Sequence, residues 1–271
     1  MNEIRQGVPE AGEVITNVGS EYFSEEDKEE ILEHLTEEEK NYYDVNTPDM
    51  ILLKRYEEYN NEVQAIIQIE DTIMNHPVMQ SFDDEGFYLY HDLDRNYNPH
   101  GVPFLTLDSD LYRNRGNIVI FGHNIRAHDR DVFCDLEFLE DISYYKEHPV
   151  ITLITDKGTA KYLIFAYYLV DTSDEDAFVY WEDEIWGSKA NFERYMDEVE
   201  ARNWYQTDIP YDYDDQFLTL SSCSVELAHS GTNKMIVMAR RLEVGEDYAP
   251  YIENASLRDD PVLPDKLTKE K

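Results

Sequence analysis

Short apolar runs rich in β-branched and aromatic residues recur between residues 65 and 239. Polar, turn-rich segments separate these runs, and this spacing predicts a mostly antiparallel sheet or barrel. The predicted strands cover residues 65–69, 87–91, 117–121, 150–155, 160–170, 217–222 and 235–239.

Four further segments have the spacing of helices. Residues 131–139 and 188–203 interrupt the predicted strands, and the second carries an apolar face formed by Phe192, Tyr195, Met196 and Val199. Thr47-Pro48 begins an earlier helix. Ser24, followed by three acidic residues, has the pattern of an N-cap. We expect the two N-terminal helices to pack against the larger β-rich body.

These patterns divide the chain into three parts. Residues 1–49 form an acidic leader and helix, residues 50–245 form the main domain, and residues 246–271 form a polar tail that we expect to be poorly ordered. The first residues lack the basic and apolar segments of a signal peptide. No apolar run approaches the roughly 18 residues needed to span a bilayer.

The charge balance excludes some classes of function. The chain carries 23 Lys and Arg residues against 59 Asp and Glu residues, a net charge of −36. A nucleic-acid-binding protein needs a basic face, and so does a protein that docks on an anionic membrane through its surface. Hydrophobic residues make up 42% of the chain, enough to bury a real core.

No metal site and no cofactor are predicted. The two cysteines, Cys134 and Cys223, form no CxxC motif and have no zinc-type spacing with histidine. The acidic runs at 171–176 and 212–215 match no calcium loop, so we interpret them as solvated surface. A disulfide between the cysteines stays open at this stage, as does a cysteine nucleophile that acts with a distant histidine.

The best candidates for such a pair are Cys223 and His123. Each follows an apolar β-rich run, so a rigid strand would hold it while its side chain faces solvent. A thiolate can attack a carbonyl, and an imidazole can carry protons to and from the departing and incoming amines. Cys134 lies in an apolar helical patch, where plain packing is the expected role.

Several motifs in order resemble the class B sortases, the membrane-anchored cysteine transpeptidases of Gram-positive bacteria. Residues 117–124 resemble the family's "ntviYGHN" motif, which carries the catalytic histidine, and residues 219–223 resemble "TLSTC", which carries the nucleophile. Shorter matches lie at residues 69–73, 76–80, 87–91 and 133–136. The resemblance spans residues 50–245, and the long helix before the cysteine strand is typical of class B.

The resemblance implies a mostly β fold: an eight-stranded sortase-like β-barrel with N-terminal helices and a long helix before the cysteine strand. It implies that Cys223 is the nucleophile and His123 the general acid/base. The implied partners are surface proteins with a C-terminal sorting motif and an amine acceptor on peptidoglycan or on a pilin-like protein. The implied location is the extracellular face of the cell membrane, held by an anchor outside this chain.

The chain departs from the family pattern at the catalytic arginine, where Lys234 stands instead. Arg240 shares the strand face of Lys234 but lies roughly 20 Å away at about 3.3 Å per residue. Arg241 points to the other face, and Arg126 lies on an unmatched loop. We therefore predict Lys234 as the third catalytic residue.

Two neighbours of these residues are predicted to contact substrate, Ser221 and Asn124. For Ser221 the alternative is a strand-end hydroxyl that satisfies the backbone. Two functions stay open. One is a working sortase B-like transpeptidase, and the other is an impaired sortase-fold protein that binds sorting motifs or surface-protein partners with little turnover.

Overall fold

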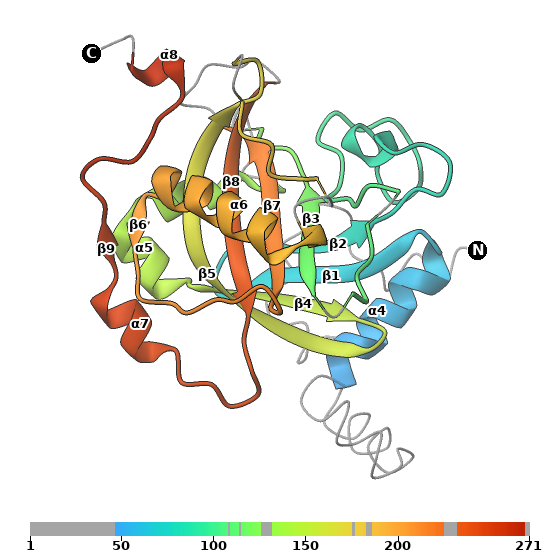
Figure 1. Ribbon diagram of the computed structural model, residues 1–271. Helices are drawn as coiled ribbons and strands as arrows, with labels where there is room; N and C mark the ends of the chain where they lie inside the picture. Colours follow the sequence, from blue (N-terminus) through green and yellow to red (C-terminus); the bar gives the residue numbers. More distant parts are fainter. Residues whose placement is uncertain are drawn as a thin grey trace.

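The computed structural model describes residues 47–107, 109–113, 115–125, 132–174, 177–182, 186–224 and 232–268. Seven strands of this part form one curled sheet (Figure 1). They are β1 (Val63–Ile69), β2 (Asn75–Met79), β3 (Gly116–Phe121), β4 (Val150–Thr155), β5 (Gly158–Asp171), β7 (Gln216–Cys223) and β8 (Asn233–Arg241). Their order is β2-β1-β4-β5-β8-β7-β3.

Neighbouring strands are antiparallel except for one pair. β3 and β7 run parallel, with Phe121 opposite Ser221. The carboxyl ends of these two strands therefore meet at the same edge of the sheet. The motif at residues 117–124 runs through the end of β3, and the motif at residues 219–223 ends β7, so both lie at this edge.

The sheet closes through a short bridge rather than through a full eighth strand. The Phe104 amide donates to the Phe121 carbonyl at 2.8 Å, and the Leu105 amide donates to the Met79 carbonyl at 2.8 Å. These bonds join β3 to β2, the two edges of the sheet. Pro103 precedes Phe104 and has no N–H to donate, and this segment makes isolated bridges. Among the described residues the sheet therefore has seven strands, one fewer than the barrel that the resemblance implied.

Two helices cover the outside of the barrel (Figure 1). α4 (Thr47–Tyr59) buries Leu52, Leu53 and Tyr56 in a core shared with β1 and β4. α6 (Lys189–Arg202) packs over β5 and is the predicted long helix. The Ser188 hydroxyl caps α6 by accepting from the Asn191 amide at 3.2 Å, as expected for serine at an N-cap.

Two of the predicted elements differ in kind. Residues 87–91 contain the single 3-10 turn η2 (Phe87–Leu89) instead of a strand. Its amides bond locally, from Leu89 to the Gly86 carbonyl at 3.1 Å, so the aromatic content of the run was misleading. The helix expected at 131–139 is the 3-10 helix η3 (Cys134–Glu140), followed by α5 (Ile142–Glu147). Residue 131 lies outside the described residues.

The expectation of a poorly ordered tail is wrong as far as residue 268. This segment holds α7 (Ala249–Asn254), β9 (Ser256–Leu257) and α8 (Asp265–Thr268). β9 pairs with β6 (Tyr205–Gln206). The Val262 amide also donates to the Ala201 carbonyl of α6 at 2.8 Å, so backbone hydrogen bonds hold the tail in place. The helix predicted from Ser24 lies outside the described residues.

Within the described part of the chain, no helix combines the length and the apolar character needed to cross a bilayer.

Candidate active site

Cys223 and Lys234 face each other across two paired strands. Cys223 is the last residue of β7, and its direct partner on β8 is Lys234. Directly opposite residues of an antiparallel pair project from the same face of the sheet. The Lys234 Nζ lies 3.7 Å from the Cys223 Sγ, and both residues are half-buried. Strand pairing thus places an amino group beside the thiol.

His123 lies at the same edge of the sheet, two residues beyond the end of β3. The Gly122 amide donates to the Ser221 carbonyl at 3.1 Å, which extends the β3–β7 pairing by one residue. The Ser222 hydroxyl donates to the Gly122 carbonyl at 2.8 Å. These bonds tie the segment that carries His123 to the end of the strand that carries Cys223.

Gly122 is required by a close approach. A Cβ atom at this position would lie 2.7 Å from the ring of Phe133. The glycine lets the chain pass over Phe133, whose amide donates to the His123 carbonyl at 3.0 Å. Phe133, the residue that precedes η3, therefore contacts Gly122 and bonds to His123.

The surroundings of His123 favour its neutral form. Burial is the main influence and lowers the pKa of His123 from its ordinary value of 6.5. A hydrogen bond from the ring to the Leu89 carbonyl opposes this shift, and the positive charges of Lys234 and His100 add to it. The Nε2 atom is buried and has no hydrogen-bond partner among the described residues. The imidazole is therefore ready to accept a proton near neutral pH.

Ser221 and Asn124 are both buried and bonded within the protein. The Ser221 hydroxyl bonds to the Tyr180 hydroxyl at 2.7 Å. The Asn124 side-chain amide donates to the Cys223 carbonyl at 3.2 Å and also to the Glu137 carboxylate. Both residues thus support the strand end that carries Cys223, and their contact with substrate stays a prediction.

Sequence reasoning missed the residues that provide this support. Tyr180 and Glu137 lie in segments without a recognisable motif, and the Leu89 carbonyl belongs to a run that was interpreted as a strand. The ring of Tyr90 lies 5.3 Å from that of His123, measured between centroids. Aromatic and acidic residues are common in this chain, so composition gave no signal to single these out.

Two of the other candidate cations, Arg240 and Arg241, do not lie beside the thiol. Arg240 is buried, forms an ion pair with Glu246, and lies opposite Phe217 near the start of β7. Arg241 donates to the Gln216 side chain at 3.1 Å. Arg126 lies outside the described residues.

The cysteines form no disulfide, so the option left open by the sequence is closed. Cys134 is buried within η3, as expected for a packing residue. The described residues contain no group of three or more His, Cys, Asp or Glu side chains placed to hold a metal ion.

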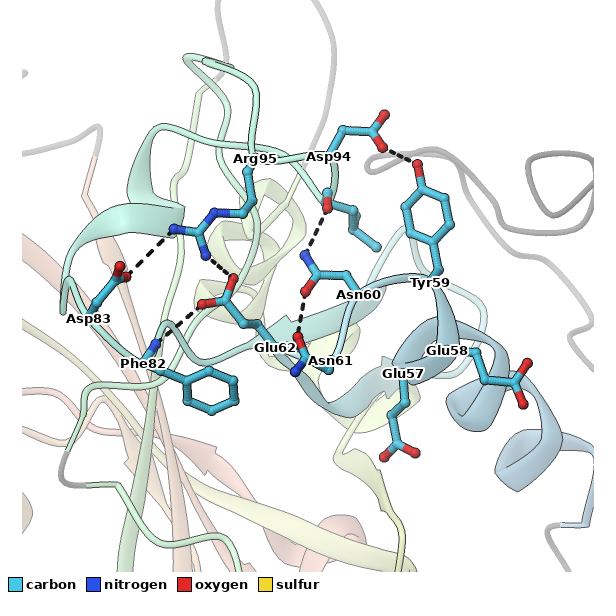
Figure 2. Close-up of a pocket in the computed structure, with 11 residues that line it drawn as sticks. Glu57, Glu58, Tyr59, Asn60, Asn61, Glu62, Phe82, Asp83, Asp94 and Arg95 are labelled. Atoms are coloured by element: carbon cyan, nitrogen blue, oxygen red, sulfur yellow. Dashed lines mark hydrogen bonds and ion pairs between the residues drawn. The ribbon is translucent and has the colours of Figure 1, made fainter. Parts of the chain in front are cut away.

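A separate pocket of about 670 Å³ lies where α4, β1 and residues 82–95 meet (Figure 2). Glu62 is buried at its centre and accepts from the Tyr88 hydroxyl at 2.5 Å and from the Arg95 guanidinium. Figure 2 shows Glu62 directed toward Arg95, whereas Glu58 turns away from it. Because the buried carboxylate is satisfied by partners within the protein, we assign it to the fold rather than to a ligand site.

The hydrogen bonds of Glu62 predict a pH-dependent contribution to stability. Burial alone would raise the pKa of Glu62, but hydrogen bonds from Tyr88, Arg95 and the Phe82 amide, together with the charge of Arg95, outweigh burial and lower it. A lowered pKa in the folded state stabilises the fold above the usual value of about 4.3, and this contribution is lost as pH falls through the lowered pKa.

We therefore expect Glu62→Gln to reduce the free energy of unfolding by about 1.5–3 kcal/mol at neutral pH, the scale of hydrogen bonds to a charged group. Urea unfolding at neutral pH and below the lowered pKa would measure the effect, which should shrink in acid. Glu58→Gln, an exposed acid of the same pocket, serves as the control and should change stability by less than about 0.5 kcal/mol. Equal effects of the two substitutions would contradict the assignment.

Comparison with known proteins identifies the family. A model described as the sortase domain matches residues 67–242, more than half of the chain. The chain is 24% identical to sortase B of Staphylococcus aureus over 217 residues, which cover 76% of this chain and 85% of that protein. It is 27% identical to sortase B of Listeria monocytogenes over 179 residues, which cover 64% of this chain and 68% of that protein.

A solved structure described as a Staphylococcus aureus sortase B–substrate complex has the same fold. The TM-score is 0.63 at 23% identity, with 82% of this chain and 100% of that chain covered. The motifs around His123 and Cys223 thus led to the family that the comparisons identify: the chain belongs to the sortases and is a cysteine transpeptidase of class B.

Proposed function

We propose that this sortase is catalytically active. In this proposal it cleaves a C-terminal sorting motif of surface proteins and transfers the acyl group to an amine of peptidoglycan or of a pilin-like protein. The domain formed by residues 50–245 carries the reaction at the extracellular face of the membrane. The observation that supports the proposal most is the 3.7 Å separation of the Lys234 Nζ from the Cys223 Sγ.

The first half-reaction breaks a peptide bond. The neutral imidazole of His123 takes the proton of the Cys223 thiol as the sulfur attacks the scissile carbonyl carbon. The imidazolium then gives this proton to the departing amine, and the C–N bond breaks. The acyl group stays on Cys223 as a thioester.

The second half-reaction makes a new amide. The acceptor amine attacks the thioester carbonyl and loses a proton to the imidazole of His123. The C–S bond breaks, and the sulfur leaves with its electron pair and regains a proton. The enzyme returns to its starting state, so the cycle needs no cofactor.

Lys234 supplies positive charge in both halves. An ammonium group beside the sulfur stabilises the negative charge that develops on the sulfur and on the carbonyl oxygen. Lysine offers one compact, hydrated charge, whereas the guanidinium of arginine offers a planar fork that can bind two acceptors at once. Lys234 thus provides the charge without the bidentate geometry.

We expect Lys234→Ala to lower kcat/KM by about 10²- to 10³-fold, the scale of losing one donor to a developing oxyanion. Lys234→Arg restores the fork and should give a rate at or above that of the wild type. Lys161→Ala is the matched control, because Lys161 is exposed and lies at the opposite end of the β5–β8 pairing from Lys234. An alanine variant at position 234 with the wild-type kcat/KM would refute this role.

A ligation assay tests the proposed function as a whole. The protein is incubated with a panel of sorting-motif peptides and triglycine as the amine, and products are separated by liquid chromatography. We expect one peptide to be cleaved and joined to triglycine. Reversible binding of a peptide without cleavage would instead favour the alternative, a sortase-fold protein that binds sorting motifs with little turnover.

A further inference from the structure

Lys234 differs chemically from an arginine in one respect that bears on the thioester. An arginine guanidinium stays protonated in proteins and has no nucleophilic lone pair. A lysine that loses its proton becomes a primary amine, the chemical class of the acceptor in the proposed reaction. Lys234 therefore places a potential acyl acceptor permanently inside the active site.

The backbone holds this amine close to the acyl group. Cys223 and Lys234 are direct partners on paired strands, so neither main chain can move away from the other without breaking the sheet. With Nζ 3.7 Å from Sγ, a carbonyl carbon bonded to Sγ can lie about 3–3.5 Å from Nζ, the separation of a near-attack conformer. Groups held this way react with effective concentrations far above those of a dissolved amine.

We propose that Lys234 is an internal modification site, which takes the acyl group from the Cys223 thioester when no acceptor amine arrives. This inference rests on the proposed function, because it needs the thioester. The Lys234 ammonium first loses a proton to solvent. Its nitrogen then attacks the carbonyl carbon, the C–S bond breaks, and the sulfur leaves with the electron pair. The nitrogen gives its second proton to this thiolate.

The products are an amide on the Lys234 side chain and a regenerated Cys223 thiol. No oxidant or reductant takes part. The amide removes the positive charge beside Cys223 and places an acyl chain in its position, so each transfer inactivates one enzyme molecule.

An activated ester tests this inference without any sorting motif. The full chain is treated with p-nitrophenyl acetate, which transfers an acetyl group to a nucleophilic thiol. Tryptic peptides are then mapped by mass spectrometry, before and after treatment with hydroxylamine, which cleaves thioesters but not amides. Acetylation of Lys234 also removes the tryptic cleavage after this residue. Acetylation of the exposed Lys161 measures how much lysine the reagent modifies directly.

We expect an acetyl group to appear first on Cys223 as a hydroxylamine-labile thioester, and then on Lys234 as a stable amide. Acetylation of Lys234 should exceed that of Lys161 by at least about a hundredfold, given the effective concentration of a positioned amine. In Cys223→Ala this excess should vanish, since the amine then has no thioester to attack. In Lys234→Arg the acetyl group should stay on Cys223 until water hydrolyses it.

Three results would overturn the inference. A thioester that forms on Cys223 and hydrolyses without reaching Lys234 overturns the inference alone and leaves the proposed function intact. Equal acetylation of Lys234 in the wild type and in Cys223→Ala would show direct modification by the reagent. Failure to acetylate Cys223 at all contradicts the nucleophile on which both the inference and the proposed function depend.

Discussion

Cleavage and transfer of a sorting peptide are expected to disappear in Cys223→Ala and to persist largely unchanged in Cys134→Ala. The chemistry requires a thiol at the end of β7, where the side chain is half-buried and has Lys234 beside it. Cys134 is buried within η3 and packs in the interior. The rate of triglycine ligation measures both variants, and the loss in Cys223→Ala should be complete because Cys134, the other thiol of the chain, is buried.

The activities of the two cysteine variants can be compared only if both variants are folded. Circular dichroism and thermal unfolding of both should match the wild type closely. Equal loss of activity in two folded variants would contradict the assignment of Cys223 as the nucleophile.

His123→Ala is expected to lower kcat/KM by on the order of 10²-fold or more, the contribution of a positioned acid/base group. The wild-type rate should fall as pH drops through the pKa of His123, because the protonated ring cannot take the thiol proton. Burial, Lys234 and His100 lower this pKa, so the acidic limb of the pH–rate profile should lie below the ordinary value of 6.5.

A charge variant tests the direction in which Lys234 shifts the pKa of His123. Lys234→Gln removes a positive charge that disfavours the imidazolium, so the pKa of His123 should rise and the acidic limb should move to higher pH. Lys161→Gln, at the far end of the β5–β8 pairing, should leave the limb in place. If the acidic limb is unchanged in His123→Ala, the limb reflects the titration of another group. That result would contradict the role of His123.

Hydrophobic patterning predicted most of the sheet because the buried faces of its strands are long and apolar. The predicted strand at residues 150–155 has the same bounds as β4, and residues 160–170 fall within β5. β2 was missed because Pro77 lies in its centre, and proline is uncommon inside strands. An edge strand tolerates proline, and β2 ends the sheet at this side. The register and the parallel pairing of β3 with β7 depend on contacts between distant residues, which a local pattern does not contain.

The active site was predictable to a similar extent. Each of the motifs that carry His123 and Cys223 contains the end of an apolar β-rich run, and strand ends hold functional side chains rigidly. The pairing of Cys223 with Lys234 needed the register of β7 against β8. The hydrogen bonds of Tyr180 and Glu137 were not predictable, since each arises from a segment brought to the site by the fold rather than by its own sequence pattern.

Intact-protein mass spectrometry during turnover can detect the acyl-enzyme intermediate on Cys223 itself. The enzyme is mixed with its sorting peptide without an amine, quenched in acid at early times, and the adduct is mapped by peptide analysis. At these early times we expect a single hydroxylamine-labile acyl group on Cys223, which disappears when triglycine is added. Peptide binding with no adduct at any time, or an adduct first formed elsewhere, would contradict it.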